Sequence, residues 1–246
     1  MRSGIVIVVT SGKGGTGKTS VTAGVGAALA ALDRKVLCLD ADLCLRNLDL
    51  CMGLSDQAVL DFSDVLSGAC TLEQAAVPHP TRSGLALLAA PFRLKTAPDE
   101  AAFGKLLDTI REQYDFCLID SPAGLDTGFH LAGVHADRGL VVATGDASSL
   151  RDAQRAAEEL RSLGVTELHL VVNRVRKSLL RRMALTVDDA MDQTALPLLD
   201  LIPEDDAVPL ANNAGRLLTP TRRGAAAAYR NIARRLCGES VRLLKL

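Results

Sequence analysis

Short apolar segments alternate along the chain with segments that repeat every three to four residues. The apolar segments are five to seven residues long and rich in valine, isoleucine and leucine, which is typical of strands buried on both faces of a sheet. The predicted strands are Ile5–Thr10, Lys35–Asp40, Leu85–Ala89, Phe116–Asp120, Gly139–Thr144, Glu167–Asn173 and Leu198–Ile202.

The segments between these strands carry helical patterns. Phe103, Leu106 and Ile110 form one apolar stripe, and Ser149 and Gly164 have the positions of a helix cap and a helix stop. The predicted helices are Lys18–Leu32, Pro98–Tyr114, Ser149–Leu163 and Ala225–Leu236. This alternation predicts an α/β fold, with a mostly parallel sheet flanked by helices on both faces.

The composition fits one such domain. The chain has 246 residues, of which 48% are hydrophobic, so it can bury a large core and is not disordered throughout. No apolar run reaches the ~18 residues that a membrane span needs. Met1-Arg2-Ser3 leads directly into a strand, so no signal peptide is expected. We expect a single domain over residues 1–238 and a short tail over residues 239–246.

The charges are unevenly distributed. The chain carries 28 basic and 29 acidic side chains, and the net charge of −1 argues at first against a nucleic-acid or membrane-surface protein. Residues 222–246, however, hold seven basic side chains and one acidic one, so this segment is +6 and the remainder is −7. A basic C-terminal segment on an otherwise acidic chain indicates that this segment contacts something specific to it.

The six cysteines show no C-x-x-C spacing, and the four histidines are scattered. A metal or iron–sulfur site would need clustered ligands. Cys38 and Cys117 lie within apolar strands, where a thiol acts as a small buried hydrophobe. We therefore expect buried thiols rather than ligands.

One glycine-rich segment carries specific chemistry. Gly12-Lys13-Gly14-Gly15-Thr16-Gly17-Lys18-Thr19 fits the pattern G-x-x-x-x-G-K-[ST], follows a predicted strand and opens a predicted helix. Its glycines let backbone N–H groups point at phosphate oxygens, and the helix N-terminus favours negative charge. Lys18 can reach the β- and γ-phosphates, and the Thr19 hydroxyl can ligate Mg²⁺. With Ser20, this loop is the predicted nucleotide-binding segment.

Three aspartates lie where parallel strands end. Asp120 and Asp40 each close an apolar strand, and Asp42 follows two residues later. An isolated aspartate at such a place is most simply a turn or capping residue. In a chain with a phosphate loop, carboxylates at this edge of the sheet are instead expected to position a metal and water.

The segment Lys13–Thr19 resembles the deviant Walker A motif of the MinD/ParA family of ATPases. In that family the early lysine reaches across a dimer to the phosphates bound by the partner, and the resemblance implies this catalytic role for Lys13. It also implies a three-layer P-loop NTPase fold, ATP and Mg²⁺ as cofactors, and slow, partner-stimulated hydrolysis of ATP to ADP and phosphate.

Further segments resemble the same family in its order. Residues 40–49 look like the first switch of the MinD branch, and residues 120–124 look like the second. The resemblance implies that Asp42 orients the attacking water, while Asp40 and Asp120 act with Thr19 through the metal. Two more segments match those lining the adenine pocket, and they contain Asn173, Arg174, Pro203, Glu204 and Asp205.

Other branches of the family fit less well. Partition proteins of the ParA/Soj branch usually carry Pro-Gln where this chain has Leu43-Cys44, and the flagellar-number FlhG branch tends to lack an arginine at the position of Arg46. Two residues depart from the MinD pattern. Cys44 replaces a common glycine, which is expected to affect turnover more than binding, and Thr16 replaces valine or isoleucine.

The end of the chain resembles a short form of the amphipathic membrane helix of the MinD branch. Its apolar residues are Val241, Leu243, Leu244 and Leu246, beside basic Arg242 and Lys245. One such tail binds marginally, whereas two tails in an ATP-bound dimer gain from effective concentration. A solvated terminus is the alternative. The preceding helix is expected to pack Tyr229, Ile232 and Leu236 onto the domain.

The resemblance implies an ATP-dependent homodimer that places the division site, moving from the cytoplasm to the inner face of the cell membrane. Implied partners are a division inhibitor of the MinC type, an activating topological-specificity factor of the MinE type and anionic lipid. A basic cluster keeps DNA as a less favoured partner, as in partition ATPases. Its members are Arg174, Arg176, Lys177, Arg181 and Arg182.

Overall fold

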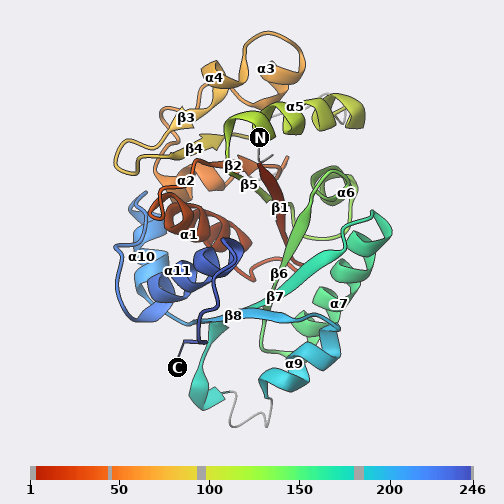
Figure 1. The fold of residues 1–246 in the computed structure, drawn as a ribbon, viewed down its shortest axis with the longest axis vertical. Coiled ribbons are helices and arrows are strands. Elements are labelled where there is room, and N and C mark those ends of the chain that lie inside the picture. Colours follow the sequence, from red (N-terminus) through yellow and green to blue (C-terminus); the bar gives the residue numbers. More distant parts are fainter. Residues whose placement is uncertain (1–3, 44–45, 93–97, 180–185, 245–246) are drawn as a thin grey trace.

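The computed structural model describes residues 4–43, 46–92, 98–179 and 186–244. Within these ranges one eight-stranded sheet forms the centre of the molecule, in the order β3-β4-β2-β5-β1-β6-β7-β8 (Figure 1). The strands are β1 Ile5–Thr10, β2 Val36–Asp40, β3 Val77–Pro78, β4 Leu85–Leu88, β5 Phe116–Asp120, β6 Arg138–Thr144, β7 Glu167–Val175 and β8 Leu198–Pro203.

All neighbouring strands are parallel except β3 and β4. Parallel neighbours need a crossover segment, and here most crossovers contain a helix. The helices are α1 Lys18–Ala30, α2 Leu48–Met52, α3 Phe62–Leu66, α4 Leu72–Ala75, α5 Glu100–Gln113, α6 Thr127–Gly133, α7 Ala147–Ser162, α9 Val187–Thr194, α10 Ala207–Asn213 and α11 Gly224–Leu236.

The helices form two layers around the sheet (Figure 1). One face packs against α5, α6, α7 and α9, and the other packs against α1, α2 and α11. Tyr229, Ile232 and Leu236 of α11 are buried, as predicted. Cys38 and Cys117 are buried on opposite faces, and burial raises the pKa of both thiols.

The predicted strands and helices are all present, with ends within two residues of those expected. The cap predicted for Ser149 was wrong: α7 begins earlier, and the side chain of Asp146 accepts the capping hydrogen bond from the Ser149 nitrogen at 3.0 Å. Ser149 Oγ instead accepts from Thr144 N at 2.9 Å. The α/β fold class is confirmed, and β3 is an addition of two residues.

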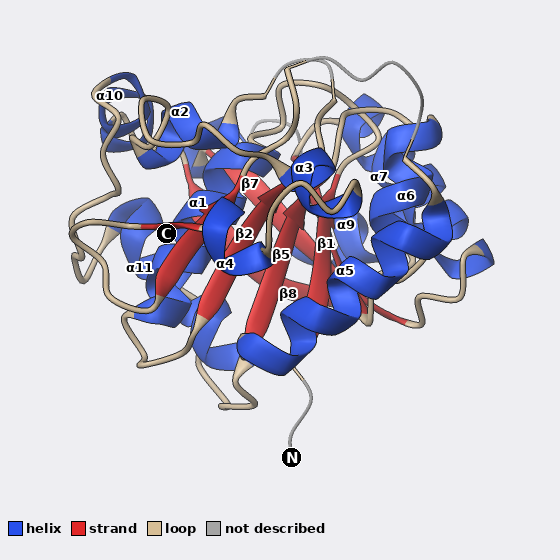
Figure 2. Cartoon of the chain, turned by 90° about the horizontal axis from the view of Figure 1, so that it is seen from above, coloured by secondary structure: helices blue, strands red, loops and turns tan. Residues whose placement is uncertain are grey.

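The carboxyl ends of the parallel strands meet at one edge of the sheet, beneath the loops that carry the candidate chemistry (Figure 2). Asp40 and Asp120 are register partners on neighbouring strands β2 and β5. Within the described part of the chain, no helix has both the length and the apolar character needed to cross a membrane.

Candidate nucleotide site

The glycine-rich loop lies between β1 and α1, as predicted. β1 ends at the buried Thr10, and α1 begins at Lys18. Gly17 has a φ of 92°, a left-handed conformation, and provides no side-chain cap, so the first N–H groups of α1 are available to phosphate oxygens. Gly12 is needed for space, because a Cβ there would lie 2.1 Å from the backbone oxygen of Asp152.

Asn173, at the carboxyl end of β7, holds the loop in place. Its Nδ2 donates to the backbone oxygen of Thr16 at 2.8 Å, and its Oδ1 accepts from the Arg174 nitrogen at 2.9 Å. A Cβ at Gly17 would approach Nδ2 to 2.4 Å. The sequence placed Asn173 only in an adenine pocket, because a contact across 157 residues leaves no local signal.

Lys18 is the buried lysine of the loop. Burial lowers its pKa, while the charges of Asp120 and Asp42 oppose that shift. Thr22, one turn further along α1, donates to the Lys18 backbone oxygen at 3.0 Å and approaches Asp120 Oδ1 at 3.3 Å. The structure therefore brings Lys18 together with two of the predicted carboxylates.

Asp40 and Asp120 are both almost completely buried. Asp40 accepts hydrogen bonds from the nitrogens of Asp42 at 2.9 Å and Leu48 at 3.1 Å, yet burial raises its pKa to about 6. Burial also raises the pKa of Asp120 to about 7, with the Asp40 charge adding to the shift. Hydrogen bonds from Thr19 and Thr22 and the Lys18 charge act in the opposite direction.

This donor set fits Mg²⁺. Two buried carboxylates with raised pKa values are unfavourable as a pair of anions, and a divalent cation relieves their repulsion. Carboxylate and hydroxyl oxygens are the ligands that Mg²⁺ prefers. Thr19, Asp40 and Asp120 are the residues that would hold the ion, directly or through water.

Lys13 lies apart from this group. Its side chain is half exposed, and Nζ contacts Ser148 Oγ at 3.1 Å and Asp146 Oδ1 at 4.0 Å. Partial burial opposes ionisation of Asp146, but hydrogen bonds from Thr144, Ser148 and Ser149, with the Lys13 charge, lower its pKa to about 2. The two lysines of the loop therefore have opposite environments.

A cavity of about 610 Å³, counting the part that is open to solvent, adjoins the loop. It contains all the residues predicted for the adenine side, between the loop, the ends of β7 and β8, and α10. Four further lining residues carried no sequence signal for this role. The lining is Gly15, Gly17, Ser20, Asn173, Arg174, Pro203, Glu204, Asp205, Val208, Pro209, Asn212 and Tyr229.

The acidic residues of this cavity are already engaged. Glu204 pairs with Arg174 Nε at 3.2 Å and with Arg176 Nε at 3.7 Å, so one carboxylate is shared by two members of the basic cluster. Asp205 accepts from Ala207 N at 3.0 Å and from Ala225 N at 2.9 Å. Asp205 thus connects the starts of α10 and α11 and shapes the cavity wall.

Arg46 in the first switch segment is buried, which the sequence did not predict. It pairs with Asp49 at 2.8 Å, donates to the Ala58 oxygen at 2.6 Å and lies 4.0 Å from the centre of the Phe92 ring. The three-residue spacing from Arg46 to Asp49 was the available signal. Arg46 therefore anchors the switch to two segments that follow it in the chain.

Several predicted features lie partly or wholly beyond the described residues. These are Cys44, Arg181, Arg182, Lys245 and Leu246. In the described part of the tail, Leu243 is 47% exposed, while Leu244 packs against the core and donates its backbone N–H to Asp200.

A glycine-rich loop between a central parallel strand and the following helix, with acids at the adjacent strand ends, defines a P-loop nucleotide-binding protein. The chain matches the family described as "CobQ/CobB/MinD/ParA nucleotide binding domain" over residues 7–218. It is 39% identical over 246 residues to the septum site-determining protein MinD of Bacillus subtilis, covering 98% of this chain and 91% of that one.

Solved structures agree with this match. A chain of the MinC:MinD cell division protein complex of Aquifex aeolicus superposes with a TM-score of 0.89 at 38% identity, covering 98% of both chains. MinD from Pyrococcus horikoshii, complexed with Mg-ADP, gives 0.84 at 30% identity and covers 94% of this chain and 95% of its own. A ParA family ATPase of Chlorobium tepidum gives 0.80 at 20% identity, which shows a shared fold.

The chain belongs to the MinD/ParA nucleotide-binding family, and MinD proteins are its relatives at 38–40% identity over nearly the full length. It is a nucleotide-binding ATPase with ATP and Mg²⁺ as cofactors. The predicted MinD-like function is supported over the partition and flagellar-number alternatives.

Proposed function

We propose that the chain is an ATP-driven dimerising switch that places the site of cell division. One observation carries the proposal: Lys18 is buried where the charges of Asp120 and Asp42 act on it, whereas Lys13 of the same loop contacts Ser148 at the start of α7. A second lysine that does not serve its own loop is available to a second copy of the chain. Two copies facing each other would then each supply Lys13 to the other's nucleotide.

The remaining residues have roles that follow from their positions. Lys18 and the N–H groups at the start of α1 bind phosphate, and Asp42 orients the attacking water beside Lys18. Thr19, Asp40 and Asp120 would hold Mg²⁺, directly or through water, and the ion would supply neutralisation of the phosphate charge. Asn173 keeps the loop in shape, and residues 203–205 with Arg174 form the base-side wall.

The proposed switch also has partners. A MinC-type inhibitor is supported by the Aquifex aeolicus relative, which has been solved as a MinC:MinD complex. A MinE-type activator follows from the MinD relationship. We assign residues 1–238 to the ATPase domain and residues 239–246 to a tail that reaches anionic membrane in the dimer, with Val241, Leu243, Leu244 and Leu246 as its apolar residues.

The substitution Lys13→Ala tests the proposal. The variant should bind ADP and ATP as a monomer with affinities close to those of the unchanged chain, since Lys13 does not contact the Lys18 site. It should lose ATP-dependent dimers in size-exclusion chromatography with light scattering. Lys35→Ala removes an exposed lysine just before β2 and serves as the matched control. Dimers of Lys13→Ala with ATP would rule out the shared-lysine mechanism.

A further inference from the structure

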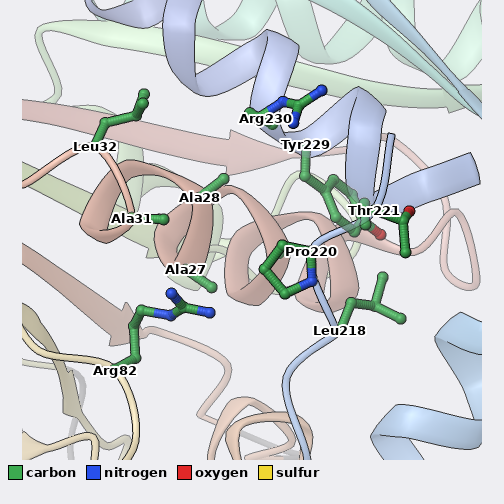
Figure 3. A pocket seen from close by; sticks show the side chains of 12 residues that line it. Ala27, Ala28, Ala31, Leu32, Arg82, Leu218, Pro220, Thr221, Tyr229 and Arg230 are labelled. Atoms are coloured by element: carbon green, nitrogen blue, oxygen red, sulfur yellow. The ribbon is translucent and has the colours of Figure 1, made fainter. Parts of the chain in front are cut away.

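A second cavity lies between α11 and the C-terminal half of α1 (Figure 3), at the end of that helix away from the phosphate loop. Its volume, counting the part that is open to solvent, is about 530 Å³. The α1 wall is formed by Gly24, Ala27, Ala28 and Ala31, whose spacing puts them on one face of the helix. Because these side chains are small, they leave room that larger residues would fill.

The opposite wall is also mainly apolar. Leu218 and Pro220 close the cavity from the segment before α11, and the ring of Tyr229 forms part of its floor (Figure 3). Tyr229 packs so closely on α1 that a Cβ at Gly24 would lie 2.4 Å from its ring. The walls therefore suit a hydrocarbon chain rather than a polar ligand.

One cationic group enters this apolar space. Figure 3 shows the guanidinium group of Arg82 next to Ala27, at the wall of the cavity. Its Nε is buried and has no hydrogen-bond partner, and the side chain forms no ion pair within the described residues. A desolvated donor of a charged group is costly when unpaired. The partial negative charge at the end of α1 accounts for a cation here but does not satisfy Nε.

The matching ligand has an apolar chain and one planar anion. A guanidinium group binds a carboxylate with two parallel hydrogen bonds, and Nε is one of the donors used in that arrangement. Arg230, exposed at the rim, adds positive charge on the α11 side. We propose that this cavity binds a fatty acid, with the acyl chain along the alanine face of α1 and the carboxylate on Arg82.

Binding of decanoate to the full chain, measured by calorimetry below its micelle concentration, tests the proposal, with decanol as the uncharged probe of equal length. Decanoate should bind more tightly than decanol. Arg82→Met, which keeps an apolar stem, should weaken decanoate by about 10- to 100-fold, as expected for loss of a charge-assisted bond, and leave decanol unchanged. Ala28→Leu should abolish binding of both probes by filling the cavity.

Two controls distinguish this cavity from general adsorption. Arg34→Met removes an exposed arginine just beyond α1 that does not line the cavity, and it should bind decanoate normally. The chain has two tyrosines and no tryptophan, so ring-labelled tyrosine gives two NMR signals. Tyr229 also lines the nucleotide cavity, so the measurement is made with Mg-ADP bound. Decanoate should then shift Tyr229 and leave Tyr114, which packs on the other face of the sheet. Equal binding of decanol, normal binding by Arg82→Met, or equal shifts of both tyrosines would overturn the proposal.

Discussion

At the scale of single residues, burial determines the pKa values of the two aspartates at the edge of the sheet. Asp40 and Asp120 lie opposite each other on two buried strands, and both have raised pKa values. A group with a raised pKa in the folded chain binds more protons there than in the unfolded chain. Its stabilising contribution is therefore complete below pH ~4 and is lost as the pH rises through the folded pKa.

Asp120→Asn should flatten this pH dependence. In EDTA, the free energy of unfolding of the unchanged chain should fall between pH 5 and pH 7.5 because of these two acids, by on the order of 1.4 kcal/mol per unit of pKa shift crossed. The variant should fall less and be more stable at pH 7.5. Urea unfolding at both pH values measures the difference.

The exposed Asp56 provides the control, since Asp56→Asn should leave the slope unchanged. Addition of Mg²⁺ with ADP should stabilise the unchanged chain most at the higher pH and should stabilise the Asp120→Asn variant much less. Equal slopes for the two chains in EDTA would show that Asp120 is ionised in the folded state at no cost.

Residue patterns predicted some of this site and missed the rest. The phosphate loop and the three aspartates were found because each adjoins a strongly apolar strand. The bracing of the loop by Asn173 and the partners of Lys13 were not found, since those contacts join distant parts of the chain. Valine or isoleucine is usual in the family at the position of Thr16. The Thr16 hydroxyl is buried and has no hydrogen-bond partner among the described residues, as expected where an apolar side chain is usual.

At the scale of elements, the length of each helix or strand determined whether the sequence could predict it. The long helices α1, α5, α7 and α11 and seven strands carry clear periodicities. The helices α2, α3 and α4 have five residues or fewer, which is too short for an apolar stripe to be recognised. The start of α10 depends on the side chain of Asp205, which also bonds the start of α11.

Asp205→Ala should therefore affect two helices and the cavity between them. Loss of two capping hydrogen bonds should lower the free energy of unfolding by about 1–3 kcal/mol, and ADP affinity should fall because the cavity wall loosens. Asp99→Ala, which removes the cap of α5 far from the cavity, is the matched control. It should reduce stability without changing ADP affinity in calorimetry, and equal losses of affinity would refute a specific role for Asp205.

At the scale of the whole molecule, the tail after α11 packs against the rest of the chain. Arg235 pairs with the buried Asp200 at 2.7 Å and donates to the Val241 oxygen at 2.7 Å, while the Leu244 nitrogen bonds to Asp200. Arg234 pairs with Glu239 at 2.6 Å. A membrane-bound tail would have to lose the contacts of Val241 and Leu244 with the rest of the chain. The higher effective concentration of two tails in a dimer helps to offset this loss.

Co-sedimentation with anionic vesicles tests that exchange. The full chain should pellet with ATP and much less with ADP, and a chain ending at Gly238 should not pellet with either. Leu243→Ser, in the exposed part of the tail, should reduce pelleting strongly. Leu210→Ser changes a leucine of α10 that is 68% exposed and should have no effect. Pelleting with DNA instead of vesicles would favour a partition function.

The position of β1 in the sheet has a consequence for synthesis of the protein. β1 is among the first segments made, yet its neighbours β5 and β6 follow about a hundred residues later, and the nucleotide cavity includes Tyr229. The phosphate loop therefore leaves the ribosome long before the other walls of its cavity exist. We therefore expect nucleotide to stabilise the chain only after residues up to Tyr229 have been made and folded.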